Sequence, residues 1–326
     1  MTENLNRPSV GIFFIIIGVV AITLNDLMIK LLSGGYPLHE MVFIRSGLGI
    51  IFSLIFVQFE GGFGILRTKT PWLHLLRGII IVISNMTYFA ALAALPLADA
   101  TALFFVAPLL ITLLSIPILG EKVGPWRLGA VAVGFCGVLL MMQAWSGDSA
   151  PADVPFIILT LPIISALTYA LNQIMTRKLG VASKASAMSV YIQMTFIVVS
   201  IGFYLVAGDG RFAEGVTNES VVFLMRAWVM PEGNDRWVFA ALGLNSAIIG
   251  FCLGQAYRLA SAATLAPFEY LGLPLAVFWG WLIWAEFPTP LVLGGIALIM
   301  GSGIFVFIRE QIQSRPMIKK RVRRRY

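Results

Sequence analysis

Long apolar stretches alternate with short polar connections along almost the whole chain. Ten of these stretches approach the roughly 20 residues that an α-helix needs to cross a bilayer. They cover residues 10–32, 39–58, 72–95, 98–119, 125–143, 155–175, 186–207, 237–257, 263–285 and 289–308. The pattern predicts an all-α polytopic membrane protein with ten transmembrane helices.

The second half of the chain repeats features of the first half in the same order. The matched pairs, separated by 165 or 166 residues, are Pro108 with Pro274, Glu121 with Glu286, Gly129 with Gly295, and Gly137 with Gly303. A shorter pattern, N-[D/Q]-x-M-x-[K/R], occurs at 25–30 and again at 172–177. Ordered recurrence of this kind indicates duplication of one unit. Because five crossings per unit is an odd number, we expect two inverted-topology five-helix repeats, residues 10–143 and 155–308.

Composition agrees with a membrane protein and argues against several other classes. Hydrophobic residues make up 59% of the chain and charged residues 12%. The net charge of +7 is no sign of nucleic-acid binding, because residues 315–325 of the tail 309–326 contain seven Lys or Arg residues, which suit an anionic cytoplasmic lipid surface. Without a Walker loop, HExxH or CxxC motif, the sequence predicts no cofactor, no metal site and no enzyme activity.

Charge also predicts the orientation of the helices. Most basic residues in the connections fall on one side, which we assign to the cytoplasm together with both termini, and acidic residues outnumber the basic ones in the long connection 208–236 on the other side. The opposite side receives the acidic connection around Asp148 and the long connection 208–236. Within the latter, residues 220–230 are apolar but too short to span, which indicates an interfacial or re-entrant helix. We expect the protein in a bacterial inner membrane.

Several motifs resemble one known family. They are the LGEKV turn at 119–123, the LAPFEYLGLP stretch at 265–274, the WAEFPTP stretch at 284–290 and the glycine-rich helix that follows. Together with the ten-span pattern they resemble the EamA-type branch of the drug/metabolite transporter superfamily over residues 10–308. The resemblance implies import or export of small metabolites such as amino acids, vitamins or nucleotide-like molecules. It implies few site residues, because the family has no diagnostic catalytic motif, and connection 208–236 is longer than the family pattern.

Polar residues inside the apolar stretches are the candidates for a substrate path. A charge at the centre of a spanning helix costs about 2.5–3.5 kcal/mol on insertion scales, so such residues should face a partner or a water-filled cavity. The candidates are Asn25, Asp26, Arg45, Asn85, Tyr88, Asn172, Gln173, Asn245, Glu269 and Tyr270.

Structural roles compete with functional ones at the charged candidates. Asp26 either pairs with Lys30 one helical turn away or faces the cavity. Arg45 either partners Asp26 or receives an anionic group of the substrate. Glu269 is either neutralised by Arg258 or serves as a proton carrier or a site for a cationic group.

Other residues have mainly structural interpretations. We expect Lys30 to pair with Glu40 across the first hairpin and Arg77 to extend toward the cytoplasmic surface. Pro108 and Pro274 should bend their helices, since proline cannot donate to the helical ladder.

The predicted function is secondary transport of a small polar or amphiphilic metabolite by alternating access. The predicted partners are that solute and the lipid bilayer, with no nucleic acid. One alternative is a non-transporting receptor or assembly factor that docks through residues 208–236. Another is a membrane-embedded lipid enzyme, supported only by the buried polar residues.

Overall fold

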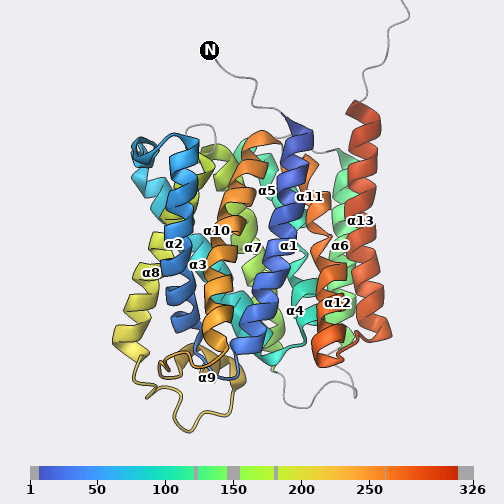
Figure 1. Cartoon of the computed structure of the whole chain (residues 1–326). Coiled ribbons are helices and arrows are strands. Elements are labelled where there is room, and N and C mark those ends of the chain that lie inside the picture. Colours follow the sequence, from blue (N-terminus) through green and yellow to red (C-terminus); the bar gives the residue numbers. More distant parts are fainter. Residues whose placement is uncertain (1–6, 121–123, 145–154, 180–182, 261, 315–326) are drawn as a thin grey trace, which may run out of the picture.

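A computed structural model describes residues 7–120, 124–144, 155–179, 183–260 and 262–314. The regular elements in these ranges are all helical (Figure 1). The α-helices are α1 (Pro8–Leu32), α2 (Leu38–Glu60), α3 (Pro71–Ala94), α4 (Leu97–Phe104), α5 (Ala107–Leu119), α6 (Pro125–Ala144), α7 (Phe156–Leu179), α8 (Ala185–Ala207), α9 (Glu219–Met225), α10 (Asp235–Leu259), α11 (Ala262–Glu269), α12 (Gly272–Trp284) and α13 (Pro290–Ser314). A short 3-10 helix, η1 (Phe63–Leu66), follows α2.

The long helices have the length and apolar character of membrane spans. Among the described residues, seven segments qualify, namely α1, α2, α3, α4 with α5, α7, α8 and α10. Helices α6, α12 and α13 supply shorter apolar stretches. The chain is therefore an all-helical membrane protein with multiple spans. Each of the ten predicted stretches overlaps one of these helices or a broken pair.

Two predicted helices are broken, and prolines explain both breaks. Helix α4 ends at Phe104, and α5 begins at Ala107, one residue before Pro108. The ring of Pro108 clashes with the carbonyl group four residues earlier, that of Phe104. Pro274 stands in the same relation to Tyr270, where α11 has ended and α12 has not yet begun. The expected bends are thus full interruptions of the helical ladder.

Helices from the two ends of the chain pack in pairs. Helix α1 runs along α10, α3 along α7, α2 along α8, and α6 along α13 (Figure 1). Glycine allows the backbones of α6 and α13 to touch, since a Cβ atom on Gly137 would lie 2.8 Å from the carbonyl oxygen of Gly295. The same test on Gly295 gives 2.7 Å to the oxygen of Gly137.

The first turn of α1 and the last turn of α13 lie at one end of the bundle, and α9 lies at the other (Figure 1). The segment around α9 is bonded to the helices beneath it. Ser220 donates to the carbonyl oxygen of Ala90 at 2.6 Å, and the Val229 amide donates to Glu40 at 3.0 Å. Helix α9 has seven residues, too few to span. It ends at Met225, whereas the predicted apolar helix extends to residue 230.

Two ion pairs join distant parts of the chain at opposite ends of the helices. Lys30, near the end of α1, lies 3.3 Å from Glu286 after α12. Glu60, at the end of α2, lies 3.6 Å from Arg258 near the end of α10. The predicted Lys30 pairings with Glu40 and Asp26 were therefore wrong, because tertiary packing brings Glu286 closer. The Glu121-Lys122 turn, Asp148 and residues 315–326 of the basic tail lie outside the described residues.

Candidate functional site

A cavity of about 160 Å³ lies among α1, α2, α3, α4, α7, α8 and α10. Its wall combines amide, guanidinium and hydroxyl groups with aromatic rings. Seven of the ten predicted site residues line it: Asn25, Asp26, Arg45, Asn85, Tyr88, Asn172 and Gln173. The lining residues recur at helical spacing along their helices. Examples are residues 189, 192, 193 and 196 of α8 and residues 246, 249, 250 and 253 of α10.

Arg45 is held in the wall by two asparagine side chains. Its guanidinium donates to Asn25 Oδ1 at 3.2 Å and to Asn85 Oδ1 at 2.7 Å. The guanidinium carbon also lies 5.1 Å from the ring centroid of Phe196 and 5.9 Å from that of Phe89. Because Arg45 is only 5% exposed, these contacts fix a buried positive charge among aromatic faces.

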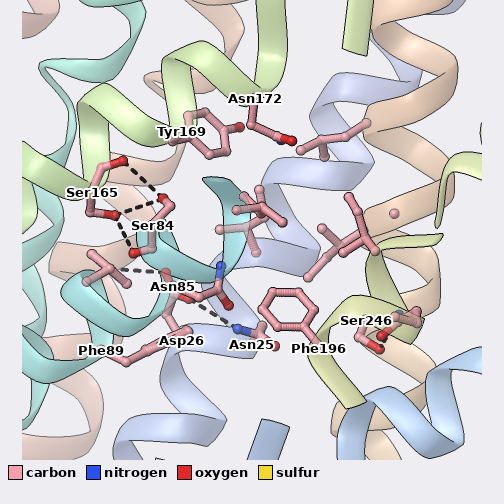
Figure 2. A pocket seen from close by; sticks show the side chains of 18 of the residues that line it. Asn25, Asp26, Ser84, Asn85, Phe89, Ser165, Tyr169, Asn172, Phe196 and Ser246 are labelled. Atoms are coloured by element: carbon pink, nitrogen blue, oxygen red, sulfur yellow. Dashed lines mark hydrogen bonds between the residues drawn. The ribbon is translucent and has the colours of Figure 1, made fainter. Parts of the chain in front are cut away.

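Asp26 is linked to Arg45 through an amide instead of a direct ion pair. The side-chain nitrogen of Asn25 donates to Asp26 at 3.3 Å, while its oxygen accepts from Arg45. The Tyr88 hydroxyl donates to the other oxygen of Asp26 at 3.2 Å. Figure 2 shows Asn25, Asp26 and Asn85 gathered in one part of the cavity, with Tyr169 and Asn172 above them. The prediction that Asp26 faces the cavity agrees with this geometry, and the alternative pair with Lys30 does not.

Three polar atoms of lining residues have no hydrogen-bond partner among the described residues. They are the donors Nε of Arg45 and Nε2 of Gln173 and the acceptor Oδ1 of Asn172. Burying such groups without a partner is costly. The wall therefore contains both donor and acceptor atoms without partners.

Arg77 also belongs to the cavity, contrary to the predicted surface role. It is buried, and its guanidinium donates to Thr176 at 2.8 Å and to the carbonyl oxygen of Met188 at 3.3 Å. Its side chain therefore spans from α3 to α7 and α8 instead of reaching the cytoplasmic surface.

Sequence reasoning also missed Ser84 and Ser165, whose hydroxyl groups donate to each other's carbonyl oxygens at 3.0 and 2.7 Å (Figure 2). Helical spacing could have found these residues. Arg77, Ser84 and Tyr88 follow one face of α3, and Ser165, Tyr169 and Asn172 follow one face of α7.

Three predicted site residues lie outside the lining of this cavity. Asn245 donates to the carbonyl oxygen of Ala21 at 2.7 Å and so joins α10 to α1. Tyr270 packs near Phe105, with ring centroids 5.8 Å apart.

Glu269, the third, accepts hydrogen bonds from the hydroxyl groups of Tyr257 and Tyr169. The expected neutralisation by Arg258 was wrong, because Arg258 extends to Glu60 at the end of α2.

Comparison with known proteins agrees with this architecture. Residues 9–143 match the EamA-like transporter family. The riboflavin transporter of Rhizobium johnstonii is 29% identical, with 95% of each chain covered. The S-adenosylmethionine uptake transporter of Rickettsia felis is 25% identical over 95% of this chain and 97% of its own. The pseudopaline exporter of Pseudomonas aeruginosa is 25% identical over 89% and 93%, respectively.

A solved crystal structure shares the fold. It has a TM-score of 0.69 at 16% identity and covers 94% of this chain and 100% of its own. The helical membrane architecture, the family match over the first half and the full-length relatives agree. The first half of the chain matches the EamA-like transporter family, and the full-length relatives are membrane transporters.

Proposed function

We propose that the chain is a secondary transporter that moves a small polar or amphiphilic metabolite across the bacterial inner membrane by alternating access. The observation that carries this proposal is the cavity within the helix bundle, in which Arg45 and Asn172 keep unpartnered polar atoms among aromatic rings. Such a cavity within a bundle of spanning helices suits a solute that is held during transit and then released.

The proposed machinery consists of two inverted five-helix repeats, residues 10–143 and 155–308. Repeated packing supports this arrangement. The first helix of each proposed repeat (α1 or α7) packs on the third spanning helix of the other repeat (α10 or α3). The broken pairs α4–α5 and α11–α12 occupy corresponding places in the two halves. The cavity lies between helices of both halves, where a rocking motion would expose it to each side in turn.

The proposed orientation places both termini in the cytoplasm. The start of α1 and the end of α13 lie at the same end of the bundle, which is what an even number of crossings requires (Figure 1). The described basic residues Arg67, Lys69 and Arg177 belong to connections or helix ends on the predicted cytoplasmic side. In this orientation α9 lies at the outer surface.

The chemistry of the cavity favours a solute with a flat heteroaromatic ring. Phe89, Phe104, Phe196 and Tyr169 supply ring faces and edges, and the neighbouring amides supply donors and acceptors. Riboflavin and S-adenosylmethionine, named for two relatives, each combine a nitrogen heterocycle with polar substituents. We therefore propose a vitamin-like or nucleoside-like metabolite as the substrate class.

The proposed binding residues are the seven predicted residues that line the cavity. Arg45 would receive an acceptor group of the solute through its free Nε atom, and Asn172 would receive a donor through Oδ1. Asn25 and Asn85 would position Arg45, and Asp26 would balance its charge through Asn25.

Uptake into proteoliposomes tests this proposal. Radiolabelled riboflavin and S-adenosylmethionine would be offered separately to vesicles that contain the wild type or the Arg45→Ala variant. Arg45→Ala should weaken solute binding by roughly tenfold or more, because it removes a buried charged donor. Arg211→Ala, which removes an exposed arginine of the outer connection, is the matched control and should leave uptake unchanged. Equal uptake by wild type and Arg45→Ala would refute the proposed site.

A further inference from the structure

Glu269 is a buried carboxyl group connected to the cavity by a single side chain. It is the last residue of α11 and is 6% exposed. The Tyr169 hydroxyl donates to its Oε1 atom at 3.5 Å, and the Tyr257 hydroxyl donates to the same atom. The ring of Tyr169 also lines the cavity. A proton on Glu269 is thus one tyrosine hydroxyl away from the place where the solute is held.

No cation neutralises Glu269 among the residues that the structure describes. Helices α1, α5, α7, α10 and α13 pack against α11. On α7, Arg177 donates to the carbonyl oxygens of Tyr257 and Ala260, and Lys178 is exposed. On α10, Arg258 pairs with Glu60, and at the first turn Asp235 accepts from Tyr36 and Arg236 donates to the carbonyl oxygen of Pro231.

The charges on the remaining neighbours are likewise engaged elsewhere. On α1, Lys30 pairs with Glu286 and Asp26 accepts from Asn25 and Tyr88. On α13, the guanidinium of Arg309 lies over the ring of Trp126. Helix α5 contains no charged residue. Tyr257 and Tyr169 are therefore the titratable groups in hydrogen-bond contact with Glu269.

This environment allows the carboxyl group to exist in two states. Burial away from any cation favours the neutral, protonated form. Two donated hydroxyl groups favour the ionised form, since hydrogen bonds to a carboxylate stabilise its charge. Loss or gain of one proton therefore changes the local charge without a compensating ion.

We propose that Glu269 binds the coupling proton of transport and exchanges it with the cavity through Tyr169. In the release step, the Tyr169 hydroxyl turns its hydrogen from Glu269 toward the cavity, and the proton on Oε1 of Glu269 passes to the hydroxyl oxygen of Tyr169. The tyrosine gives up its own hydroxyl proton to water in the cavity, so that the tyrosine ends neutral and the carboxyl group ends ionised. The reverse sequence reloads Glu269. This inference rests on the proposed function, because it names the ion whose movement drives solute transport through the same cavity.

The position of Glu269 offers a means of coupling to helix movement. The residue immediately precedes the interruption between α11 and α12, and Gly272 beyond the interruption packs against Phe105, at the corresponding break of the first half. A change of charge at Glu269 therefore occurs at the joint that links the two broken pairs.

Transport with and without a pH gradient tests the proposal. Proteoliposomes would contain the wild type, Glu269→Gln, Tyr169→Phe or the exposed control Glu214→Gln, with riboflavin and S-adenosylmethionine as separate probes. Glu269→Gln should lose accumulation driven by the pH gradient yet retain exchange of labelled for unlabelled solute. Tyr169→Phe should slow gradient-driven accumulation more than exchange, and Glu214→Gln should resemble the wild type. Gradient-driven accumulation by Glu269→Gln equal to that of the wild type would overturn the proposal.

An infrared titration separates this proposal from the proposed function. If the wild type exchanges neither probe, the substrate assignment fails, yet the proton site is still tested. The reconstituted wild type should show a protonated-carboxyl band that decreases as the pH rises, and Glu269→Gln should lack that component. The Glu214→Gln variant, which checks assignment of the band, should retain it. An unchanged band in Glu269→Gln would refute the proton site whatever the transport result.

Discussion

At the scale of single residues, the buried charges of this protein are satisfied over long sequence distances. Glu60 is the clearest case, because it gathers three helix ends around one carboxylate. It accepts from the backbone amide of Ser186 at 2.8 Å and from its hydroxyl at 2.7 Å, while Gln255 and Arg258 approach from α10. The carboxylate therefore stabilises the junction of α2, α8 and α10.

Replacement of Glu60 by Ala should lower the free energy of unfolding by roughly 3 kcal/mol, as expected when one partner of a buried ion pair is removed. Arg258 would keep its charge but lose its carboxylate partner at 3.6 Å. The thermal unfolding temperature of the protein in detergent measures this effect. Glu214→Gln in the exposed outer connection is the control, and an equally stable Glu60→Ala variant would contradict the assigned role.

These residues also show where sequence reasoning succeeds and where it ends. The spacing of Asn25, Asp26 and Asn172 placed them inside helices, and the structure brings them to one cavity. The partners of Lys30 and Arg258 were predicted wrongly, because local spacing favours neighbours within a turn or a hairpin. Their actual partners are Glu286 and Glu60, which only the packing of distant helices brings near.

At the scale of elements, hydropathy and proline positions account for most of what was predicted. Apolar length located the helices within a few residues, since the bilayer demands that length. Pro108 and Pro274 marked the two broken helices. The crossing of α6 and α13 could not be located in this way, because glycine spacing does not reveal which helix lies opposite.

A pair of alanine substitutions on α6 tests that crossing. Gly137→Ala should destabilise the protein by about 1–3 kcal/mol, because the new Cβ atom would lie 2.8 Å from the carbonyl oxygen of Gly295. Gly129→Ala on the same helix has no heavy atom within 4 Å of the new Cβ. It should leave the unfolding temperature unchanged or raise it, since Ala favours helix by about 1 kcal/mol over Gly. Equal unfolding temperatures for the two variants would contradict the close contact.

At the scale of the whole molecule, the proposed topology makes a prediction about the two membrane faces. Alkaline phosphatase fused after residue 214 should be active in bacterial cells, because that segment is placed outside. The same enzyme fused to the C-terminus should be inactive, and a C-terminal green fluorescent protein should fluoresce. Phosphatase activity at the C-terminus would indicate an odd number of crossings and would overturn the two five-helix repeats.

The segment around α9 has a consequence for the balance between the two faces. Two units of the same plan, inserted in opposite senses, would by themselves leave the inward-open and outward-open forms nearly degenerate. The corresponding connection of the first half, residues 61–70, is far shorter than residues 208–234 before α10. Ser220, Arg226 and Val229 each bond to another helix or turn, at roughly 1 kcal/mol per bond. If the three bonds form in only one of the two conformations, they raise its population relative to the other by about a hundredfold. The inserted loop would then make one conformation of a nearly symmetric transporter the favoured one in the absence of solute.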